Sequence, residues 1–160
     1  MEVQDAFVFT KFNVEGGFKK VCIKDRDQHK VAFKTKYGLY EPMVMYFGLC
    51  SSPATFQNMM NHIFCPLKDK WDKRGIKIIV YMDDILIATS VLLQDHRDAT
   101  LNVLDLLQEH DLFLKKKKCQ WEVNSINYLG LILEKGVKCM DPTKVEGIKN
   151  WPRPVNVKDV

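Results

Sequence analysis

The sequence lacks a long hydrophobic run, a paired cysteine motif and any repeated segment. No apolar stretch approaches about 18 residues, which argues against a membrane-spanning helix. The five cysteines are odd in number and form no C-x-x-C pair, which argues against a disulfide framework or a zinc site. The N-terminus has no signal-peptide pattern. We therefore expect a soluble, intracellular protein of the cytoplasm or nucleus that does not bind membranes.

A strong excess of one charge is also missing. The chain has 24 Lys and Arg residues against 20 Asp and Glu residues, a formal net charge of +4. Such a balance favours a polyanionic partner only weakly, so local clusters of charge matter more. The chain has 160 residues, 46% of them hydrophobic. A chain of this size suits one domain with a real core, because it buries roughly two-thirds of its unfolded surface.

An acidic pair between two hydrophobic runs is the most informative stretch. Ile76–Tyr81 and residues 85–89 are rich in β-branched side chains, a pattern that predicts two strands of a hairpin. The turn carries Asp83 and Asp84 instead of the Asn-Gly or Asp-Gly that tight hairpins favour. A solvated acidic turn is the simpler interpretation. Adjacent carboxylates between buried strands repel unless a cation compensates, so we favour a divalent-metal site.

The remaining periodicity predicts strands and helices that segregate along the chain. Strands are predicted at residues 6–13, 21–23, 30–35, 126–133 and 137–139, with a turn at 37–39, an apolar stretch at 43–46 and a turn at 134–136. Helices are predicted from Ser52-Pro53 onward, at residues 94–110 and from Asp141 to Trp151, where residues 151–154 end the last one. Pro66 suggests a kink or break in the first helix. Without βαβ alternation, the fold class is α+β.

The two longer helices each show an apolar stripe. In the first it consists of Phe56, Met59, Met60, Ile63, Phe64 and Leu67. In the second it consists of Leu93, Arg97, Thr100, Leu101, Leu104 and Leu107. Spacing of three and four residues places such side chains on one helix face, so we expect each stripe to be buried.

Several ordered stretches resemble the reverse transcriptases of gypsy-type long-terminal-repeat retrotransposons. They are residues 9–18, 47–57, Tyr81-Met82-Asp83-Asp84, 114–119, Tyr128-Leu129-Gly130, 139–145 and 151–154. The resemblance covers nearly the whole chain. It implies a polymerase palm-like antiparallel sheet with helices packed on one face. It further implies that residues 1–160 are a palm with partial fingers at about 19–45, and that the thumb and ribonuclease H regions are absent.

The resemblance also implies an RNA-directed DNA polymerase that transfers nucleotides with two Mg²⁺ (or Mn²⁺) ions. Asp83 and Asp84 would bind the metal, together with the backbone of Val14. The third ligand position of the family is an Asp, and this chain has Asn13 there. An amide offers one neutral oxygen and no charge, so we expect activity to be strongly reduced or lost. Glu15, two residues further on, is a candidate for partial substitution.

Other roles follow from the same resemblance. Nucleotide or template binding is expected at Phe18, Phe47, Gly48, Gln57, Tyr81 and Met82. Phe18 would exclude a sugar 2′-hydroxyl, although a core Phe after two glycines is an almost equal alternative. Lys118, or its neighbour Lys117, would meet the leaving pyrophosphate. Tyr128, Leu129 and Gly130 would grip the primer end.

The implied partners are an RNA or DNA template-primer and deoxynucleoside triphosphates. Phosphate contacts are predicted at residues 115–118 and at Lys135, Lys138 and Lys144, although a lysine run is often only a solvated segment. Two other functions remain open. One is a non-catalytic module, derived from a retroelement, that binds nucleic acid or protein. The other is a structural metal-binding domain.

Overall fold

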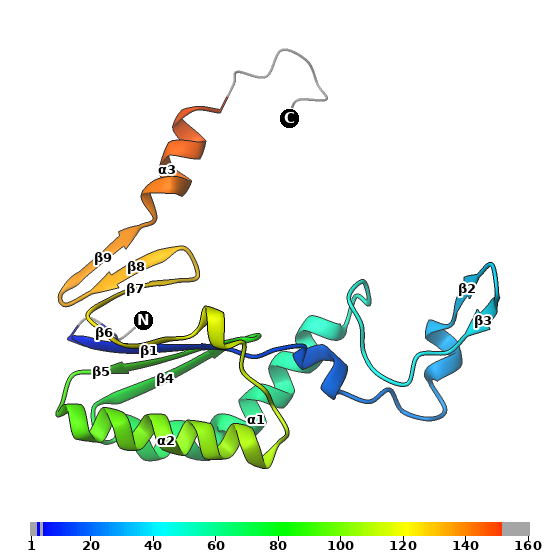
Figure 1. Cartoon of the computed structure of the whole chain (residues 1–160), viewed down its shortest axis with the longest axis horizontal. Helices are drawn as coiled ribbons and strands as arrows, with labels where there is room; N and C mark the ends of the chain where they lie inside the picture. Colours follow the sequence, from blue (N-terminus) through cyan, green and yellow to red (C-terminus); the bar gives the residue numbers. More distant parts are fainter. Residues whose placement is uncertain (1–2, 4, 152–160) are drawn as a thin grey trace.

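The fold is built on a four-stranded antiparallel sheet with the strand order β4-β5-β1-β6 (Figure 1). The strands are β1 (Val8–Asn13), β4 (Ile76–Tyr81), β5 (Asp84–Thr89) and β6 (Gln120–Val123). The computed structural model describes residues 3 and 5–151. The predicted first strand and the acidic hairpin are therefore confirmed, and they pair with each other directly.

Two helices cover one face of this sheet, α1 (Ser52–Asp72) and α2 (Leu93–Glu109) (Figure 1). The core between them contains Phe12, Phe56, Phe64 and Ile85, all with no exposed surface. Side chains alternate along β5, so Leu86 points to the opposite face. The expectation of helices packed on one face of an antiparallel sheet is confirmed.

The opposite face of the sheet carries a three-stranded antiparallel meander, β7 (Ser125–Tyr128), β8 (Leu131–Glu134) and β9 (Val137–Met140). The prediction of one strand over residues 126–133 was wrong. Leu129 and Gly130 have φ values of +53° and +79°, and this left-handed pair turns the chain between β7 and β8. β6 also had no sequence signal that we recognised, since its residues are mostly exposed.

The last helix, α3 (Pro142–Lys149), follows the meander. Asp141 caps it as predicted, accepting a hydrogen bond of 3.0 Å from the Thr143 backbone N–H. The helix ends at Lys149, before Trp151, and residues 152–154 of the predicted stop lie outside the described residues. No helix in the part of the chain that the structure describes has the length and apolar character to cross a membrane.

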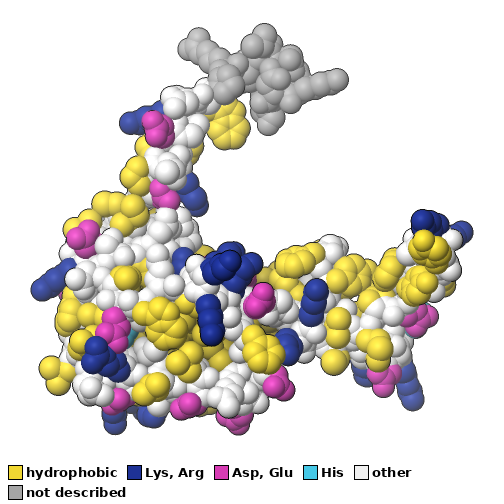
Figure 2. All heavy atoms as spheres, in the orientation of Figure 1, with side chains coloured by type: hydrophobic (Ala, Val, Ile, Leu, Met, Phe, Trp, Pro, Cys, Tyr) yellow, Lys and Arg dark blue, Asp and Glu magenta, His cyan; other side chains and the backbone are white. Residues whose placement is uncertain are grey.

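Residues 19–45, which we call the arm, extend away from the sheet (Figure 1). The arm contains the second half of η1 (Gly17–Lys20), then η2 (Gln28–Val31), β2 (Phe33–Thr35) and β3 (Gly38–Tyr40). The predicted strand over 30–35 begins in the 3₁₀-helix η2 and is a strand only from residue 33. The predicted strand at 21–23 is one bridge between Cys22 and Val44, and the predicted turn at 37–39 is mostly β3. Figure 2 shows hydrophobic side chains exposed along the arm.

Two expectations about the helices were wrong. α1 continues to Asp72, so Pro66 does not break it, because buried Phe64 and Trp71 anchor the helix on both sides of the proline. In α2, Leu101 is 56% exposed, and Leu93 and Arg97 are exposed as well. The buried face of α2 consists of His96, Ala99, Thr100, Val103 and Leu107. Polar and small side chains make up much of this face, so a count of large apolar residues misplaced it.

His96 joins α2 to both inner strands of the sheet. Its Nε2 lies 2.7 Å from the Thr10 hydroxyl and its Nδ1 lies 2.6 Å from the Thr89 hydroxyl. Thr10 also accepts a hydrogen bond from the Glu122 backbone N–H. Because the imidazole is fully buried and hydrogen-bonded on both nitrogens, it holds α2 in register with β1 and β5.

Candidate active site

The end of β1 brings Asn13 directly beside the acidic pair. Asn13 is the register partner of Asp84 across the β1–β5 ladder. Its Nδ2 donates to Asp83 Oδ2 at 3.1 Å and to Asp84 Oδ1 at 2.9 Å. The Val14 backbone N–H also donates to the Asp83 carbonyl at 2.7 Å. The predicted juxtaposition of residue 13 with both carboxylates is present.

The Asn13 amide lies between two like charges, the carboxylates of Asp83 and Asp84. Asn13 is 6% exposed, and both carboxylates are partly buried. Each N–H of the amide satisfies one carboxylate, and hydrogen bonds to an ionised acceptor are stronger than neutral ones. The described residues contain no group of three His, Cys, Asp or Glu side chains that could hold a metal ion. The groups that could bind a metal ion here are therefore the two carboxylates and the Asn13 amide, and the amide turns its N–H groups toward the carboxylates.

The turn of the acidic hairpin is supported from α1. Met82 has a φ of +53°, a conformation that non-glycine residues adopt rarely and that costs about 1–2 kcal/mol. Gln57 stabilises this backbone, because its Oε1 accepts the Met82 N–H at 2.6 Å and its Nε2 donates to the Val80 carbonyl at 3.1 Å. Gln57 was expected to bind nucleotide or template. The structure places its amide on the turn that presents the carboxylates.

The β7–β8 turn reaches the same place from the other side of the sheet. Tyr128 is 1% exposed, and its hydroxyl donates to the Asp84 backbone carbonyl at 3.4 Å. Burial and, to a lesser extent, the Asp84 carboxylate raise the pKa of Tyr128, so the hydroxyl stays protonated as a donor. Leu129 and Gly130, predicted with Tyr128 to grip a primer, follow at the exposed tip of the turn. The hydrogen bond of Tyr128 links the start of this turn to the backbone of Asp84.

A small aromatic pocket opens beside Asp83. It has a volume of about 140 Å³ and is lined by Gly17, Phe18, Phe47 and Phe56 as well as by Asp83. The Phe18 ring packs between Phe47 and Phe56, with centroids 4.9 and 5.1 Å away. A Cβ at Gly17 would come within 2.4 Å of the Phe56 ring, so glycine is required for this approach. Phe18 is thus both packed on the core and part of the pocket.

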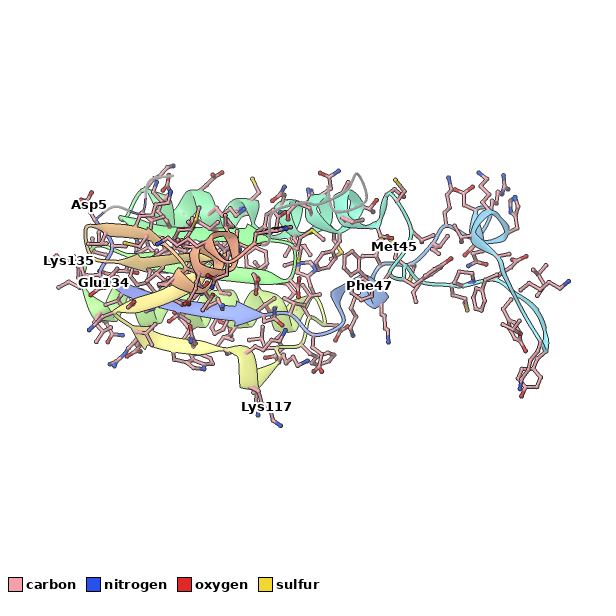
Figure 3. All side chains as sticks on the ribbon, turned by 90° about the horizontal axis from the view of Figure 1, so that it is seen from above. Asp5, Met45, Phe47, Lys117, Glu134 and Lys135 are labelled. Atoms are coloured by element: carbon pink, nitrogen blue, oxygen red, sulfur yellow. The ribbon has the colours of Figure 1, made fainter. Side chains whose placement is uncertain are left out.

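Phe47 and Gly48 lie just after the end of the arm, between it and α1. Phe47 is 80% exposed, and its position at the base of the arm is labelled in Figure 3. Gly48 has a φ of +108°, which favours glycine at that position. Tyr81 is also exposed, and no described residue hydrogen-bonds to its hydroxyl. Phe47, which contacts Phe18 on one side, and Tyr81 therefore leave much of their rings accessible to a ligand.

The predicted lysine run begins beside Asn13 in the fold, but its described side chains make no contact with the acidic pair. The Lys115 backbone N–H donates to the Asn13 carbonyl at 2.8 Å, and η3 (Lys116–Lys118) follows at once. All three η3 lysines are exposed, and Lys117 points away from the sheet (Figure 3). Among the described residues, no hydrogen bond or ion pair joins Lys118 or the exposed Glu15 to Asp83 or Asp84.

The sequence did not predict a hydrogen-bond network that joins β1, β7 and the start of α3. Lys11 donates to the Asn127 carbonyl at 2.9 Å, and Asn127 Nδ2 donates to Asp141 Oδ2 at 2.5 Å. The hydrogen bonds from Thr143, and then the one from Asn127, lower the pKa of Asp141. The partners are separated by up to 116 positions, so no local pattern indicated these contacts.

The sheet, the two helices on one face and the paired carboxylates on a hairpin define a polymerase palm of the reverse-transcriptase type. The chain belongs to the reverse transcriptase (RNA-dependent DNA polymerase) family, because the sequence model of that family matches residues 2–133. The prediction of family membership made from the motifs is confirmed.

Curated relatives come from transposons. The chain is 35% identical over 153 residues to the retrovirus-related Pol polyprotein from transposon 297 of Drosophila melanogaster, covering 95% of this chain and 14% of that protein. It is 29% identical over 161 residues to the transposon Tf2-3 polyprotein of Schizosaccharomyces pombe, covering 99% of this chain and 11% of that protein. The chain thus spans a small part of these relatives, and the expected link to retrotransposons is confirmed.

Solved structures support the fold. The foamy viral protease-reverse transcriptase in complex with an RNA/DNA hybrid matches with a TM-score of 0.78 at 19% identity, covering 99% of this chain and 21% of that one. A second structure of that viral protein, with double-stranded DNA, matches with a TM-score of 0.83 at 19% identity over 96% of this chain and 26% of that one. The α+β palm architecture predicted from the sequence is confirmed.

Proposed function

We propose that this domain binds a primer-template at the acidic hairpin and that Asn13 impairs its nucleotidyl transfer. One observation carries the proposal: the Asn13 amide donates to both Asp83 and Asp84. The structural neighbours named above were solved with an RNA/DNA hybrid or double-stranded DNA, which supports nucleic acid as the partner. Deoxynucleoside triphosphates are the proposed second substrate, by family.

The residues present fit a divalent ion in part. Asp83 and Asp84 supply hard oxygen ligands, and Mg²⁺ commonly binds one or two carboxylates plus substrate phosphates. A bound Mg²⁺ or Mn²⁺ would supply charge neutralisation for phosphoryl transfer. Asn13 offers an oxygen only if its amide rotates, which would break both hydrogen bonds to the carboxylates. Loss of one charge from such a site costs several kcal/mol of transition-state stabilisation, on the order of 10²–10³ in rate.

The surrounding residues take the other proposed roles. The pocket lined by Phe18 and Phe47 would hold the incoming nucleotide, with Phe18 against its sugar. The turn after Tyr128 would meet the primer end, since it is linked to the Asp84 backbone. Gly48, Tyr81 and Met82 would lie along the template or nucleotide. The Val14 backbone is the remaining proposed metal contact, and Lys118 the proposed partner of pyrophosphate. The arm would serve as part of the fingers.

A non-catalytic nucleic-acid-binding module is the second candidate. Asn13 favours it, because a site whose carboxylates are already satisfied by an internal amide needs no metal to stay folded. Both the impaired polymerase and the non-catalytic module would bind nucleic acid, but only the polymerase would extend a primer. We retain an intracellular setting as a proposal for both.

Primer extension with Mg²⁺ or Mn²⁺ separates the two. We expect little or no extension by the parent and a gain of at least about tenfold with Asn13→Asp, since a third carboxylate restores the charge of the site. The double variant Asn13→Asp/Asp83→Asn is the matched control and should return to background. Equal extension by the parent and Asn13→Asp would show that position 13 does not limit the reaction. Absence of primer-template binding in every variant would overturn the proposal.

A further inference from the structure

We propose that Lys144 binds a backbone phosphate of the nucleic-acid strand whose end reaches Asp83 and Asp84. The inference rests on the proposed function and names a contact of the same site. Sequence reasoning grouped Lys144 with Lys135, Lys138 and the lysine run as equivalent basic residues. The structure distinguishes them.

Lys144 lies along the tip of the β7–β8 turn. A Cβ added to Gly130 would come 2.0 Å from Lys144 Nζ, 2.6 Å from its Cε and 3.2 Å from its Cδ. The aliphatic part of the lysine therefore passes directly over the Gly130 α-carbon, and glycine is required beneath it. This arrangement brings the ammonium group of a residue on α3 to the exposed turn.

The turn beneath Lys144 is fixed on both sides. Tyr128, its first residue, donates to the Asp84 carbonyl, and the Gly130 carbonyl accepts the Asp141 N–H at 3.1 Å. Leu129 holds a φ of +53° while 46% exposed. The two-residue turn between β7 and β8 requires this conformation at both of its central positions. The ammonium group is thus held near a rigid turn that reaches the acidic pair.

Among the described residues, Lys144 forms no ion pair, although its charge is near enough to the Asp141 carboxyl to be the smallest of the causes that lower the pKa of Asp141. Asp141 is the nearest acidic residue on its helix, and its oxygens accept hydrogen bonds from the Thr143 N–H, the Thr143 hydroxyl and Asn127. Within the described ranges, the Lys144 side chain takes part in no ion pair or hydrogen bond, and its backbone N–H donates to the Asp141 carbonyl at 3.0 Å. An ammonium group that is positioned by packing, and whose neighbouring carboxylate already accepts hydrogen bonds from Thr143 and Asn127, is suited to an anion from outside the protein.

Lys135 is the contrasting case in the same meander. It lies in the β8–β9 turn, at the end of the molecule remote from Phe47 (Figure 3), and its Nζ lies 5.8 Å from the Phe7 ring centroid. Lys117 points away from the sheet in the same view. Of these three lysines, only Lys144 lies on the turn that hydrogen-bonds to the acidic pair. A phosphate near Asp83 and Asp84 also requires a cation close by, because the carboxylates repel it.

The test measures binding of a fluorescent RNA/DNA hybrid and of the matching DNA duplex across a salt series. The parent is compared with Lys144→Gln, Lys144→Arg and the control Lys135→Gln, which removes the same charge elsewhere in the meander. We expect Lys144→Gln to weaken binding about fivefold at low salt and to reduce the slope of log affinity against log salt by about 1. Lys144→Arg should keep both values near those of the parent, and Lys135→Gln should change them little.

The outcomes decide between the alternatives. Equal loss in Lys144→Gln and Lys135→Gln would mean that only net charge matters, and it would overturn the assignment while leaving the proposed function intact. A fall in melting temperature for Lys144→Gln that Lys144→Arg does not rescue would assign Lys144 to support of the turn and would also overturn it. Failure of the parent to bind either nucleic acid at low salt would overturn both the assignment and the proposed function.

Discussion

The four-stranded sheet with α1 and α2, which we call the body, and the arm use aromatic residues in opposite ways. In the body, Phe12 and Phe64 have no exposed surface. In the arm, Phe33 is 46% and Tyr37 is 77% exposed, and Met45 is the one buried residue between positions 19 and 45. β5 is paired on both edges, whereas β2 and β3 pair only with each other. The difference indicates that the body holds the acidic pair and provides nearly all of the folding free energy.

The connection between the two regions is narrow. Inside the arm, the Met45 N–H donates to the Val21 carbonyl at 2.9 Å and the Ile23 N–H donates to the Met43 carbonyl at 2.8 Å, so the segments that leave and rejoin the body are paired. Against the body, buried Met45 and partly buried Val21 and Ile23 pack on the core. Phe18 and Phe47 complete the joint through their rings. The position of the arm therefore depends on few contacts, and its first residue, Lys19, lines the pocket beside Asp83. The following experiments test this division, from the largest expected effect to the smallest.

Truncation of an aromatic side chain should give the largest difference in stability loss between the body and the arm. Phe64→Ala removes a fully buried side chain from α1, and we expect it to lower the free energy of unfolding by about 3–5 kcal/mol. Phe33→Ala in the arm is the matched control and should cost less than about 1 kcal/mol, because half of that ring remains in water. Chemical denaturation measures both. Similar losses would show that the arm folds as one unit with the body.

A charge at position 13 should affect the body through its acidic pair. Asn13→Asp removes two hydrogen bonds and adds a third carboxylate, so without metal we expect a loss of about 1–3 kcal/mol. Mn²⁺ should raise the melting temperature of this variant more than that of the parent, because a ligand that binds only the folded state stabilises it. Asn58→Asp, an exposed change on α1, is the control and should show no response to metal. Equal responses in all three proteins would exclude residue 13 as a ligand position.

The support of the hairpin turn should have a smaller effect. Gln57→Ala removes the partners of the Met82 N–H and the Val80 carbonyl, and we expect a loss of about 1–2 kcal/mol. Gln28→Ala in the arm removes the same side chain from η2, where no described contact depends on it, and should be nearly neutral. Thermal melts of the two variants compare them directly. A neutral Gln57→Ala would mean that the turn keeps its shape without α1.

The pH dependence of stability between pH 7 and 5 should also be confined to the body. Burial lowers the pKa of His96 below its ordinary value of 6.5, and Glu122 opposes this less strongly. Below pH 6.5 the unfolded chain therefore binds a proton that the folded chain does not, so stability falls as pH falls. The slope should reach at most ~1.4 kcal/mol per pH unit. His96→Gln should flatten this dependence between pH 7 and 5, whereas His29→Gln in the arm should leave it unchanged. Melting temperatures across that range test both variants.

The sequence predicted the body better than the arm for a physical reason. Strong alternation of β-branched residues marks β4 and β5, because both strands are buried, and the adjacent carboxylates between them stand out. The arm buries almost nothing, so its residues carry no periodic signal, and its predicted strands were largely misplaced. The face of α2 was misread for a related reason, since His96 is buried by hydrogen bonds rather than by its own hydrophobicity.

The sequence predicted which residues form the candidate site but not the contacts that position them. Motif resemblance was enough to expect Asn13 near Asp83 and Asp84, and β1–β5 pairing brings them together. The direction of the Asn13 amide, the support from Gln57 and the position of Lys144 over Gly130 depend on tertiary contacts between distant segments. Such contacts leave no mark in any local pattern.

The position of β5 and β1 inside the sheet determines how fast their amide protons exchange with solvent. β5 and β1 each have a strand on both sides, so their amide protons are hydrogen-bonded within the centre of the sheet. Protons of this kind exchange with deuterium only when the whole domain unfolds, whereas short exposed hairpins such as β2–β3 exchange by local opening. The acidic pair stands at the start of a slowly exchanging strand, and the arm should be labelled long before it. A ligand that reaches both regions would be recognised by new protection in the arm, with no change at β5.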